Sequence, residues 1–245
     1  MTQLLYQTDS YLREFDAAIT QVDEAQRCAF LDRTALYPGG GGQPHDTGWL
    51  HADGRSWRVA RLAKGAAHFL DGAEPLPAVG TAVRGTIDWD RRYALMRTHT
   101  ALHILCGVVW RDYQKQVTGG NMEPLAGRLD FEFAELSREL AQEIEVKINA
   151  EVRAARDLVV QILPREEAFR IPDLIRTKIN LLPPGIPEVR TVNIVGLDLQ
   201  ADGGTHVANT REVGPLRISD YKSQGKANKR LYLALEPNPP AAATP

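Results

Sequence analysis

The sequence changes character at Asp90-Arg-Arg-Tyr-Ala-Leu-Met-Arg-Thr-His-Thr-Ala-Leu-His-Ile-Leu-Cys-Gly-Val-Val-Trp-Arg-Asp-Tyr113. Apolar and imidazole side chains recur there at spacings of three and four residues, the repeat of one face of an α-helix. The positions on this face are Leu95, His99, Leu102, Cys106, Val109 and Tyr113. Asp90 can accept hydrogen bonds from the first free amide groups of the helix, so we expect it to be the N-cap.

The residues before this helix have the pattern of β-structure. Short apolar runs alternate with turn signals such as Asp53-Gly54 and Asp71-Gly72, which is typical of a small barrel or sandwich. The runs cover residues 15–19, 28–31, 57–59, 68–70 and 83–89. We therefore expect a small β-barrel-like domain over residues 1–88.

Strand and helix patterns are mixed after the long helix. Arg128-Leu-Asp-Phe-Glu-Phe133 alternates as a strand does, and Ser137 can cap a second helix. Further strands are expected within residues 189–199, 216–218 and 231–235. These patterns predict an α+β domain over residues 89–236 and an α+β fold for the whole chain. Residues 237–245 are rich in proline and alanine and predict a disordered tail.

The composition excludes several classes of protein. The chain has 245 residues, of which 43% are hydrophobic and 24% charged, close to globular averages. A net charge of −2 argues against non-specific DNA binding. Cys28 and Cys106 provide no disulfide framework and favour a reducing, cytoplasmic location. The N-terminus lacks a signal-peptide pattern, and residues 101–110 are too short to span a bilayer, which takes roughly 20 residues. We expect no DNA or membrane partner.

Two histidines of the helix are the first candidates for chemistry. His99 and His103 are four residues apart, so their side chains lie one turn apart on the same face. This spacing can place two imidazoles on one metal ion. The pair alone is more typical of hydrogen-bonded core histidines, because buried polar groups need partners.

A second candidate motif follows a predicted strand. Asp202-Gly-Gly-Thr-His206 offers a carboxylate and an imidazole on a glycine-containing turn. Alone it could be a plain turn. Together with the helical pair, it gives three imidazoles and one carboxylate, a donor set that zinc accepts in tetrahedral geometry. We therefore expect a metal site made by His99, His103, Asp202 and His206.

Two other segments suit either a structural role or contact with nucleic acid. Pro38-Gly-Gly-Gly-Gly-Gln-Pro44 matches neither a phosphate-binding loop nor a dinucleotide fingerprint, but its backbone could lie close to a nucleic-acid strand. The segment 217–230 carries five basic residues against one acidic residue. Such a run is either a solvated surface or a phosphate-binding one.

These motifs together resemble the freestanding alanyl-tRNA editing proteins, the AlaX family, and the editing domain of alanyl-tRNA synthetase. The matching motifs, in the family's order, are Tyr37-Pro-Gly-Gly-Gly-Gly-Gln-Pro-His-Asp-Thr-Gly48, Arg97-Thr-His-Thr-Ala-Leu-His103, Arg128-Leu-Asp-Phe131 and Asp202-Gly-Gly-Thr-His-Val207. A glycine-rich β domain before the editing domain is similar to the medium-length class of the family. The resemblance implies that residues 89–236 form a metal-binding editing domain of the threonyl/alanyl-tRNA synthetase second-additional-domain type.

The resemblance also implies a reaction, namely hydrolysis of tRNA(Ala) mischarged with serine or glycine at one Zn²⁺ ion. The family's zinc ligands correspond to His99, His103 and His206. The family usually has cysteine where this chain has Asp202. Aspartate can bind zinc, so we expect a site of three histidines and one aspartate, with weaker zinc retention or another divalent metal as the alternative. We expect water as the nucleophile and no catalytic residue beyond the metal site.

The resemblance also implies roles for residues around the site. Those expected to bind the aminoacyl group are Thr98, Thr100, Thr118, Gly203, Gly204 and Thr205. Those expected to bind tRNA are Gly40, Gly41, Gly42, Gln43, Lys222, Lys226, Lys229 and Arg230. We favour Thr118 as the partner of the serine hydroxyl, because its segment resembles the family's pocket strand. The alternatives are a catalytically weakened tRNA-binding protein, in which Asp202 marks a decayed metal site, and an editing protein for a different tRNA.

Overall fold

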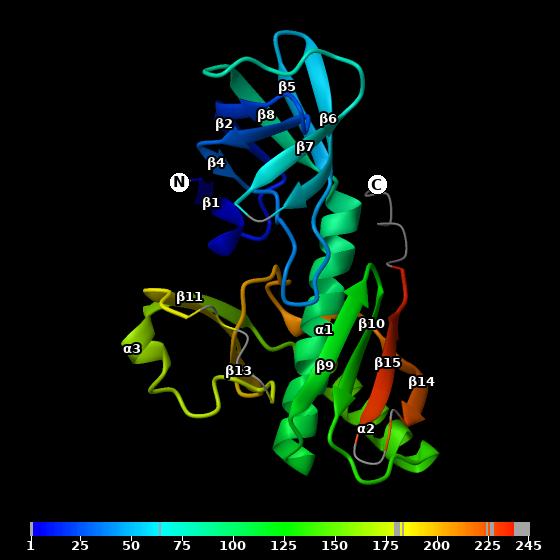
Figure 1. Cartoon of the computed structure of the whole chain (residues 1–245). Helices are drawn as coiled ribbons and strands as arrows, with labels where there is room; N and C mark the ends of the chain where they lie inside the picture. The colour runs from blue at the N-terminus through cyan, green and yellow to red at the C-terminus, as the bar shows by residue number, and fades with distance from the viewer. Residues whose placement is uncertain are drawn as a thin grey trace, which may run out of the picture. The chain divides into compact units, whose positions relative to one another are not determined.

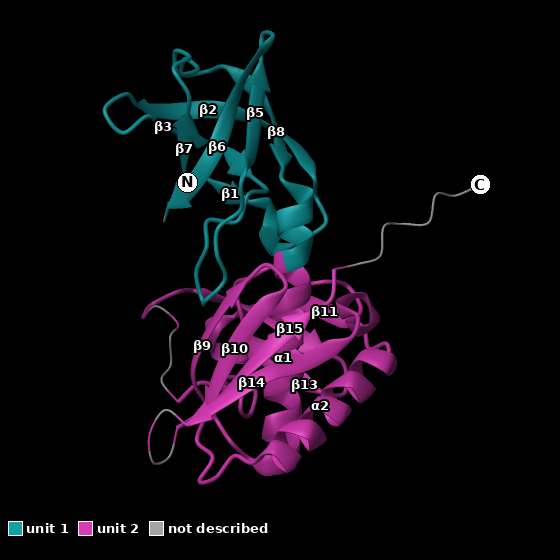
Figure 2. Cartoon of the chain, turned by 90° about the vertical axis from the view of Figure 1, so that its right-hand side faces the viewer, with its two compact units in different colours: residues 1–94 teal, residues 95–245 magenta. Residues whose placement is uncertain are grey.

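The computed structural model describes residues 2–63, 65–178, 182, 184–223, 225 and 228–237. Strands and helices are mixed along the chain (Figure 1), which confirms the α+β class. The chain divides into two compact units, residues 1–94 (unit 1) and residues 95–245 (unit 2), coloured separately in Figure 2. The functional domain limits predicted after residues 88 and 236 stay predictions. Of the expected tail at 237–245, residues 238–245 lie outside the described residues.

Unit 1 contains the expected β-barrel. Six strands close it in the order β2-β3-β7-β6-β5-β8, each pair antiparallel. Side chains alternate between its inside and outside, so Ile19, Leu31, Leu50 and Val59 fill the interior. The elements of this unit are β1 (Gln3–Leu4), η1 (Leu5–Gln7), β2 (Glu14–Asp23), β3 (Cys28–Leu31), β4 (Arg33–Thr34), β5 (Gly48–Ala52), β6 (Arg55–Ala63), β7 (Ala67–Asp71) and β8 (Ala82–Ile87).

Helix α1 (Trp89–Tyr113) begins immediately after the barrel. Its cap is Asp88, whose Oδ1 accepts a hydrogen bond from the N–H of Arg91 at 3.3 Å and whose carbonyl accepts one from Arg92 at 3.0 Å. The prediction of Asp90 as N-cap is therefore wrong. Both aspartates suit the position, but β8 ends at Ile87 and leaves Asp88 as the only residue between strand and helix. Asp90 lies in the first turn, where a negative charge favours the helix dipole.

A buried ion pair ties the start of α1 to the barrel unit. The side chains of Arg92 and Asp46 are both fully buried, and the Arg92 Nε donates to both carboxylate oxygens of Asp46 at 3.0 Å. The remaining donors of Arg92 reach the carbonyls of Ser10 at 3.0 Å and Ala35 at 2.6 Å. Asp46 also accepts the N–H of Tyr37 at 2.6 Å. Each polar group of the pair thus has a partner, as a buried charge requires.

The glycine loop begins and ends beside this ion pair. Residues 39–42 have φ values of 86°, 142°, 57° and 91°, a run of left-handed conformations that only glycine adopts without strain. Gly40 and Gln43 exchange two backbone hydrogen bonds of 3.0 and 2.9 Å, and the hydroxyl of Tyr37 donates to the Gly40 carbonyl at 3.0 Å. The loop is therefore a defined turn whose glycines 40–42 are exposed.

Unit 2 has two antiparallel sheets, one of four strands in the order β14-β15-β10-β9 and one of three in the order β11-β12-β13. The Ser137 hydroxyl caps α2 by accepting the N–H of Leu140 at 3.2 Å, as predicted. The elements are β9 (Val117–Glu123), β10 (Ala126–Phe131), α2 (Arg138–Arg153), β11 (Leu158–Pro164), α3 (Arg165–Ala168), β12 (Glu188–Ile194), β13 (Asp198–Ala201), η2 (Thr210–Val213), β14 (Leu216–Ser223) and β15 (Lys229–Leu235).

Helix α1 is buried more completely than its sequence pattern predicts. Every residue from 95 to 109 is buried, so all sides of the helix are covered over these four turns. Two glycines allow the close approach: a Cβ on Gly107 would lie 3.0 Å from the Cβ of Asp198, and a Cβ on Gly127 would lie 3.1 Å from Leu102. In the part of the chain that the structure describes, no helix is long and apolar enough to cross a membrane.

The Arg92–Asp46 pair predicts a large stability effect. Asp46→Asn should lower the free energy of unfolding by about 3–5 kcal/mol, because it leaves a buried guanidinium without its counter-charge. Arg84→Gln is the matched control, because it breaks the exposed Arg84–Glu14 pair and should change stability far less. Urea denaturation of both variants checks this. Equal effects would mean that the burial of the Arg92–Asp46 pair does not matter.

His68 predicts a dependence of stability on pH. It is fully buried with Nε2 2.9 Å from the Thr34 hydroxyl, and burial lowers its pKa from 6.5 to about 4. The unfolded chain therefore binds more protons than the folded chain between these values, so stability falls as the pH falls through this window.

Between pH 7 and pH 5, His68 should account for a loss of roughly 2 kcal/mol. Denaturation of the wild type and of His68→Gln at both pH values isolates this share, because the other titrating groups are common to both proteins. The same loss in both proteins would contradict the assignment.

Candidate metal centre

Four side chains predicted from the sequence come together in unit 2. His99 and His103 lie on α1, and Asp202 and His206 lie on the loop after β13. One potential ligand atom from each lies within 4.8 Å of the others. The three imidazole rings also contact one another, with centroids 4.2–5.1 Å apart. Neither cysteine belongs to this group.

The carboxylate of Asp202 lies between two imidazoles. Its Oδ2 is 3.0 Å from the Nε2 of His206, and its Oδ1 is 3.5 Å from the Nε2 of His99. Atoms bound tetrahedrally to zinc at about 2.1 Å lie about 3.4 Å apart. The separations of these donors therefore match those of zinc ligands, and nitrogen and carboxylate oxygen are donors that zinc accepts.

The loop that carries Asp202 is held by backbone contacts. The N–H of Gly204 donates to Asp202 Oδ2 at 2.8 Å, as in an Asx turn. Arg190 on β12 donates through Nη1 to the Asp202 carbonyl at 2.9 Å, while its own carbonyl accepts the N–H of Asp202 at 3.1 Å. Hydrogen bonds to the backbone thus fix the position of the Asp202 carboxylate.

Thr100 orients the ring of His206. The Thr100 Oγ1 lies 3.1 Å from His206 Nδ1 and accepts the N–H of Val207 at 3.3 Å. The hydroxyl can accept Nδ1–H as well, which leaves the Nε2 lone pair of His206 for a metal ion. Such outer hydrogen bonds commonly set the tautomer of a histidine ligand.

A metal ion needs neutral imidazoles and an ionised carboxylate, and the protonation states of His99, Asp202 and His206 meet this requirement. Burial lowers the pKa of His206 to about 4 and holds the pKa of His99 well below its usual value. Burial opposes the ionisation of Asp202, but its interactions with His99 and its hydrogen bond with His206 outweigh burial and hold that pKa well below its usual range. At neutral pH the site thus presents an anionic carboxylate beside two neutral imidazoles.

The other residues predicted to bind the aminoacyl group lie in different surroundings. Thr98, Thr100 and Thr205 are fully buried, and the Thr98 hydroxyl accepts the N–H of Leu125 at 2.9 Å. Gly203 and Gly204 form the turn between Asp202 and His206. Thr118 is exposed on β9 and donates to Asn228 Oδ1 at 2.6 Å. Their roles towards substrate stay predictions.

The residues predicted to bind tRNA are engaged in varied ways. Gly40, Gly41 and Gly42 are exposed, whereas Gln43 is buried. Lys222 pairs with Asp220 at 3.0 Å, and Lys229 is buried with Nζ donating to Ser223 and Gly225. Arg230 forms two hydrogen bonds to Asp130, at 2.7 and 2.8 Å. Lys226 lies outside the described residues.

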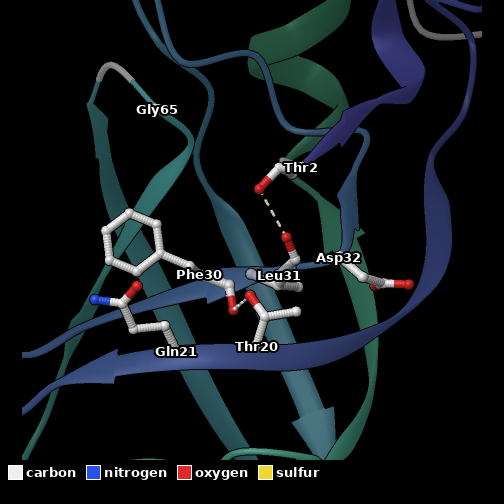
Figure 3. Close-up of a pocket in the computed structure, with 7 residues that line it drawn as sticks. All are labelled: Thr2, Thr20, Gln21, Phe30, Leu31, Asp32 and Gly65. Carbon is white, nitrogen blue, oxygen red and sulfur yellow. Dashed lines mark hydrogen bonds between the residues drawn. The ribbon is translucent and has the colours of Figure 1, made fainter.

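A pocket of about 400 Å³ lies in unit 1, and none of the four clustered side chains lines it (Figure 3). Thr2 and Thr20 line it, but their hydroxyls donate to the carbonyls of Leu31 at 2.7 Å and Phe30 at 3.1 Å. Asp32, which also lines it, accepts the N–H of Ala18 at 2.8 Å. These polar groups are used within the barrel, so the pocket lacks the convergent chemistry of the histidine cluster.

Two supporting residues are not apparent from the sequence pattern. Arg190 and Asp198 lie close to the cluster but outside its two motifs, and no spacing links them to a ligand. Asp198 lies near the end of the strand expected within residues 189–199, four residues before Asp202. That spacing alone does not distinguish an outer contact from a surface residue.

Comparison with known proteins assigns the class. Residues 189–232, which include Asp202 and His206, match the family model of the threonyl and alanyl tRNA synthetase second additional domain. Residues 7–91 match the model of tRNA synthetases class II (A). Part of unit 2 thus matches the second additional domain of these synthetases, and most of unit 1 matches the class II (A) model.

Relatives over the whole chain define the family. The chain is 38% identical to the alanyl-tRNA editing protein AlaX-M of Saccharolobus solfataricus, over 97% of this chain and 100% of the relative. It is 37% identical to the AlaX-M protein of Methanosarcina mazei, over 96% and 97%. It is also 38% identical to the alanine–tRNA ligase of Pyrococcus furiosus, over 89% of this chain and 24% of the ligase. The chain belongs to the AlaX-M family of alanyl-tRNA editing proteins.

The donor set predicts a spectroscopic signature. Cobalt(II)-substituted protein should lack intense sulfur charge-transfer absorption, because the cluster contains no thiolate. Asp202→Cys should keep one metal ion per chain and gain that absorption, since a thiolate would replace a carboxylate at the same position. An intense band in the wild type would implicate Cys106 or Cys28 as a ligand and contradict the assignment. Full metal content in Asp202→Ala would exclude Asp202.

Proposed function

We propose that this protein is a trans-editing hydrolase that removes serine, and also glycine, from mischarged tRNA(Ala). The observation that carries the proposal is the convergence of His99, His103, Asp202 and His206 in a chain that belongs to the AlaX-M family. The enzyme class is aminoacyl-tRNA hydrolase. The proposed location is the cytoplasm, where mischarged tRNA is made.

The need for such an activity follows from recognition physics. A synthetase pocket that fits alanine cannot exclude the smaller glycine by size, and it rejects an added hydroxyl by only about 100-fold. A second site that destroys the wrong product supplies the missing selectivity. That site must distinguish serine from alanine by its hydroxyl, so it needs a polar partner that alanine would leave unpaired. Thr118 stays the proposed partner.

The four clustered residues would hold one Zn²⁺ ion. When bound, zinc supplies Lewis-acid chemistry that polarises a carbonyl or orients an oxygen ligand. The ion would either lower the pKa of a nearby water or help to orient the substrate ester. Asp202 is the most exposed of the four, at 13% of its side chain.

Water is the proposed nucleophile. Two hydroxyls on α1 beside the histidines are already engaged, that of Thr98 with the Leu125 N–H and that of Thr100 with His206 and the Val207 N–H. The water oxygen forms a bond to the ester carbonyl carbon, and the bond from that carbon to the ribose oxygen breaks. One water proton passes to the ribose oxygen, so the products are the free amino acid and tRNA with an intact terminal ribose.

Deacylation of three substrates tests the proposal. The wild type should hydrolyse Ser-tRNA(Ala) faster than Ala-tRNA(Ala) by on the order of 100-fold or more, because alanine leaves the hydroxyl partner unpaired. Gly-tRNA(Ala) should be hydrolysed more slowly than the serine substrate, because glycine lacks both hydroxyl and methyl group. Hydrolysis of Ala-tRNA(Ala) at the serine rate would refute editing.

Two histidine variants separate catalysis from binding in the same assay. His103→Ala should lower kcat for Ser-tRNA(Ala) by about 100-fold or more while leaving the tRNA Kd within about threefold of wild type. His51→Ala is the matched control, since that histidine bonds to Ser56 and Thr86 in the barrel and should leave kcat unchanged. Binding of tRNA without hydrolysis by the wild type would instead favour the weakened tRNA-binding protein.

A further inference from the structure

A second carboxylate lies behind the histidine cluster. Asp198 begins β13, and its side chain is fully buried. Its Oδ2 lies 3.4 Å from the Nδ1 of His103 and accepts a hydrogen bond from Gln200 Nε2 at 2.6 Å. Its Oδ1 accepts one from Arg176 Nε at 3.4 Å. Asp198 is not among the four clustered donors, so its proximity to one of them calls for its own explanation.

Asp198 is the natural hydrogen-bond acceptor for the His103 nitrogen that faces it. The Nδ1 atom is buried and has no hydrogen bond of good geometry to any residue that the structure describes. Asp198 Oδ2 is close enough that a small rotation of either side chain would complete one. The two nitrogens lie on opposite sides of an imidazole ring, so a ring bonded to Asp198 through Nδ1 directs Nε2 away from it.

We propose that Asp198 is a positioning residue for His103: its carboxylate accepts the Nδ1–H, which fixes the ring and leaves Nε2 as the metal donor. This inference rests on the metal site of the proposed function. A carboxylate that accepts the second ring nitrogen of a histidine ligand is a common means of orienting the ligand and raising its basicity.

The surroundings of Asp198 are built to keep a carboxylate at this place. Arg176, which supplies the counter-charge, lies over the ring of Trp110 at 4.7 Å and is thereby held on one side. Gly107 in α1 leaves room for β13, because a Cβ there would lie 2.9 Å from Leu197 and 3.0 Å from Asp198. Gly107 is one helical turn from His103. Because Gly107 has no side chain, Asp198 can approach the histidine.

Charge explains why a carboxylate is useful there. A carboxylate that accepts the Nδ1–H of a histidine ligand raises the basicity of the ring. A more basic imidazole is a stronger donor, and this chain has a carboxylate rather than a thiolate at position 202. Burial, together with Asp198, also raises the pKa of the Cys106 thiol, so Cys106 stays a neutral neighbour.

Zinc affinity of the full chain, measured by competition with a chromophoric chelator, tests the inference. Asp198→Asn should weaken zinc binding about 10- to 100-fold. The amide can turn its N–H₂ towards Nδ1, which favours the tautomer with the proton on Nε2, the nitrogen needed for the metal. Asp130→Asn is the matched control. Asp130 is a carboxylate with 8% of its side chain exposed, paired with Arg128 and Arg230, and its loss should leave zinc affinity unchanged.

Thermal unfolding of the metal-free variants shows whether Asp198 acts only on stability. A structural role alone would lower the melting temperature of Asp198→Asn without changing the zinc Kd of the folded protein, and that result would overturn the proposal. If the wild type itself binds no zinc, the metal site of the proposed function is wrong and the inference fails with it. This outcome differs from an unchanged zinc Kd in Asp198→Asn, which overturns the inference alone.

Nitrogen NMR of zinc-loaded wild type needs no variant and decides the matter if Asp198→Asn fails to fold. The proposal requires a protonated Nδ1 on His103 and coordination through Nε2. A protonated Nε2, or coordination through Nδ1, would overturn it.

Discussion

Helix α1 carries polar side chains into the interior of unit 2, and the structure of this unit depends on hydrogen-bond partners for them. Between residues 95 and 109, α1 has no exposed side, yet this segment holds an arginine, two threonines and two histidines. A buried polar group without a partner is costly, so each must find one. Arg97 reaches the carbonyls of Val213 and Glu236, Thr98 reaches the turn after β9, and Thr100 reaches His206. Pairing along one helix therefore gathers segments that are distant in sequence.

Much of the site could be predicted because its donors lie in short motifs. The spacing of His99 and His103 is a property of the helix alone, and the Asp202–His206 turn is equally local. The outer contacts could not be predicted in this way. Asp198 meets His103 only because two elements separated by most of unit 2 approach at Gly107, and nothing in the helix pattern reveals that approach. The fold followed the same rule: strands and the Ser137 cap were local signals, whereas the burial of α1 on all sides came from its neighbours.

Charge along the sequence was a weaker guide than spacing. Residues 217–230 carry an excess of positive charge, but Arg230 is bound to Asp130 and Lys229 is turned inward to the loop carbonyl of Gly225. The sequence does not show which lysines and arginines are already paired with acceptors within the protein. The glycine loop shows the opposite case. Its four consecutive glycines are visible in the sequence, and in the structure they adopt left-handed conformations and form a defined turn.

The division of the chain falls inside α1, and this has a consequence for any attempt to isolate the histidine-bearing unit. The amides of residues 95–98 bond to carbonyls of the preceding helical turn, which belongs to unit 1. A fragment that begins at Leu95 would start with four unpaired amides in a segment evolved without a helix cap. Fraying of that first turn would reach His99 directly. The shortest fragment that preserves the metal donors must therefore carry a turn of helix from the barrel unit, with Asp88 as its natural starting point.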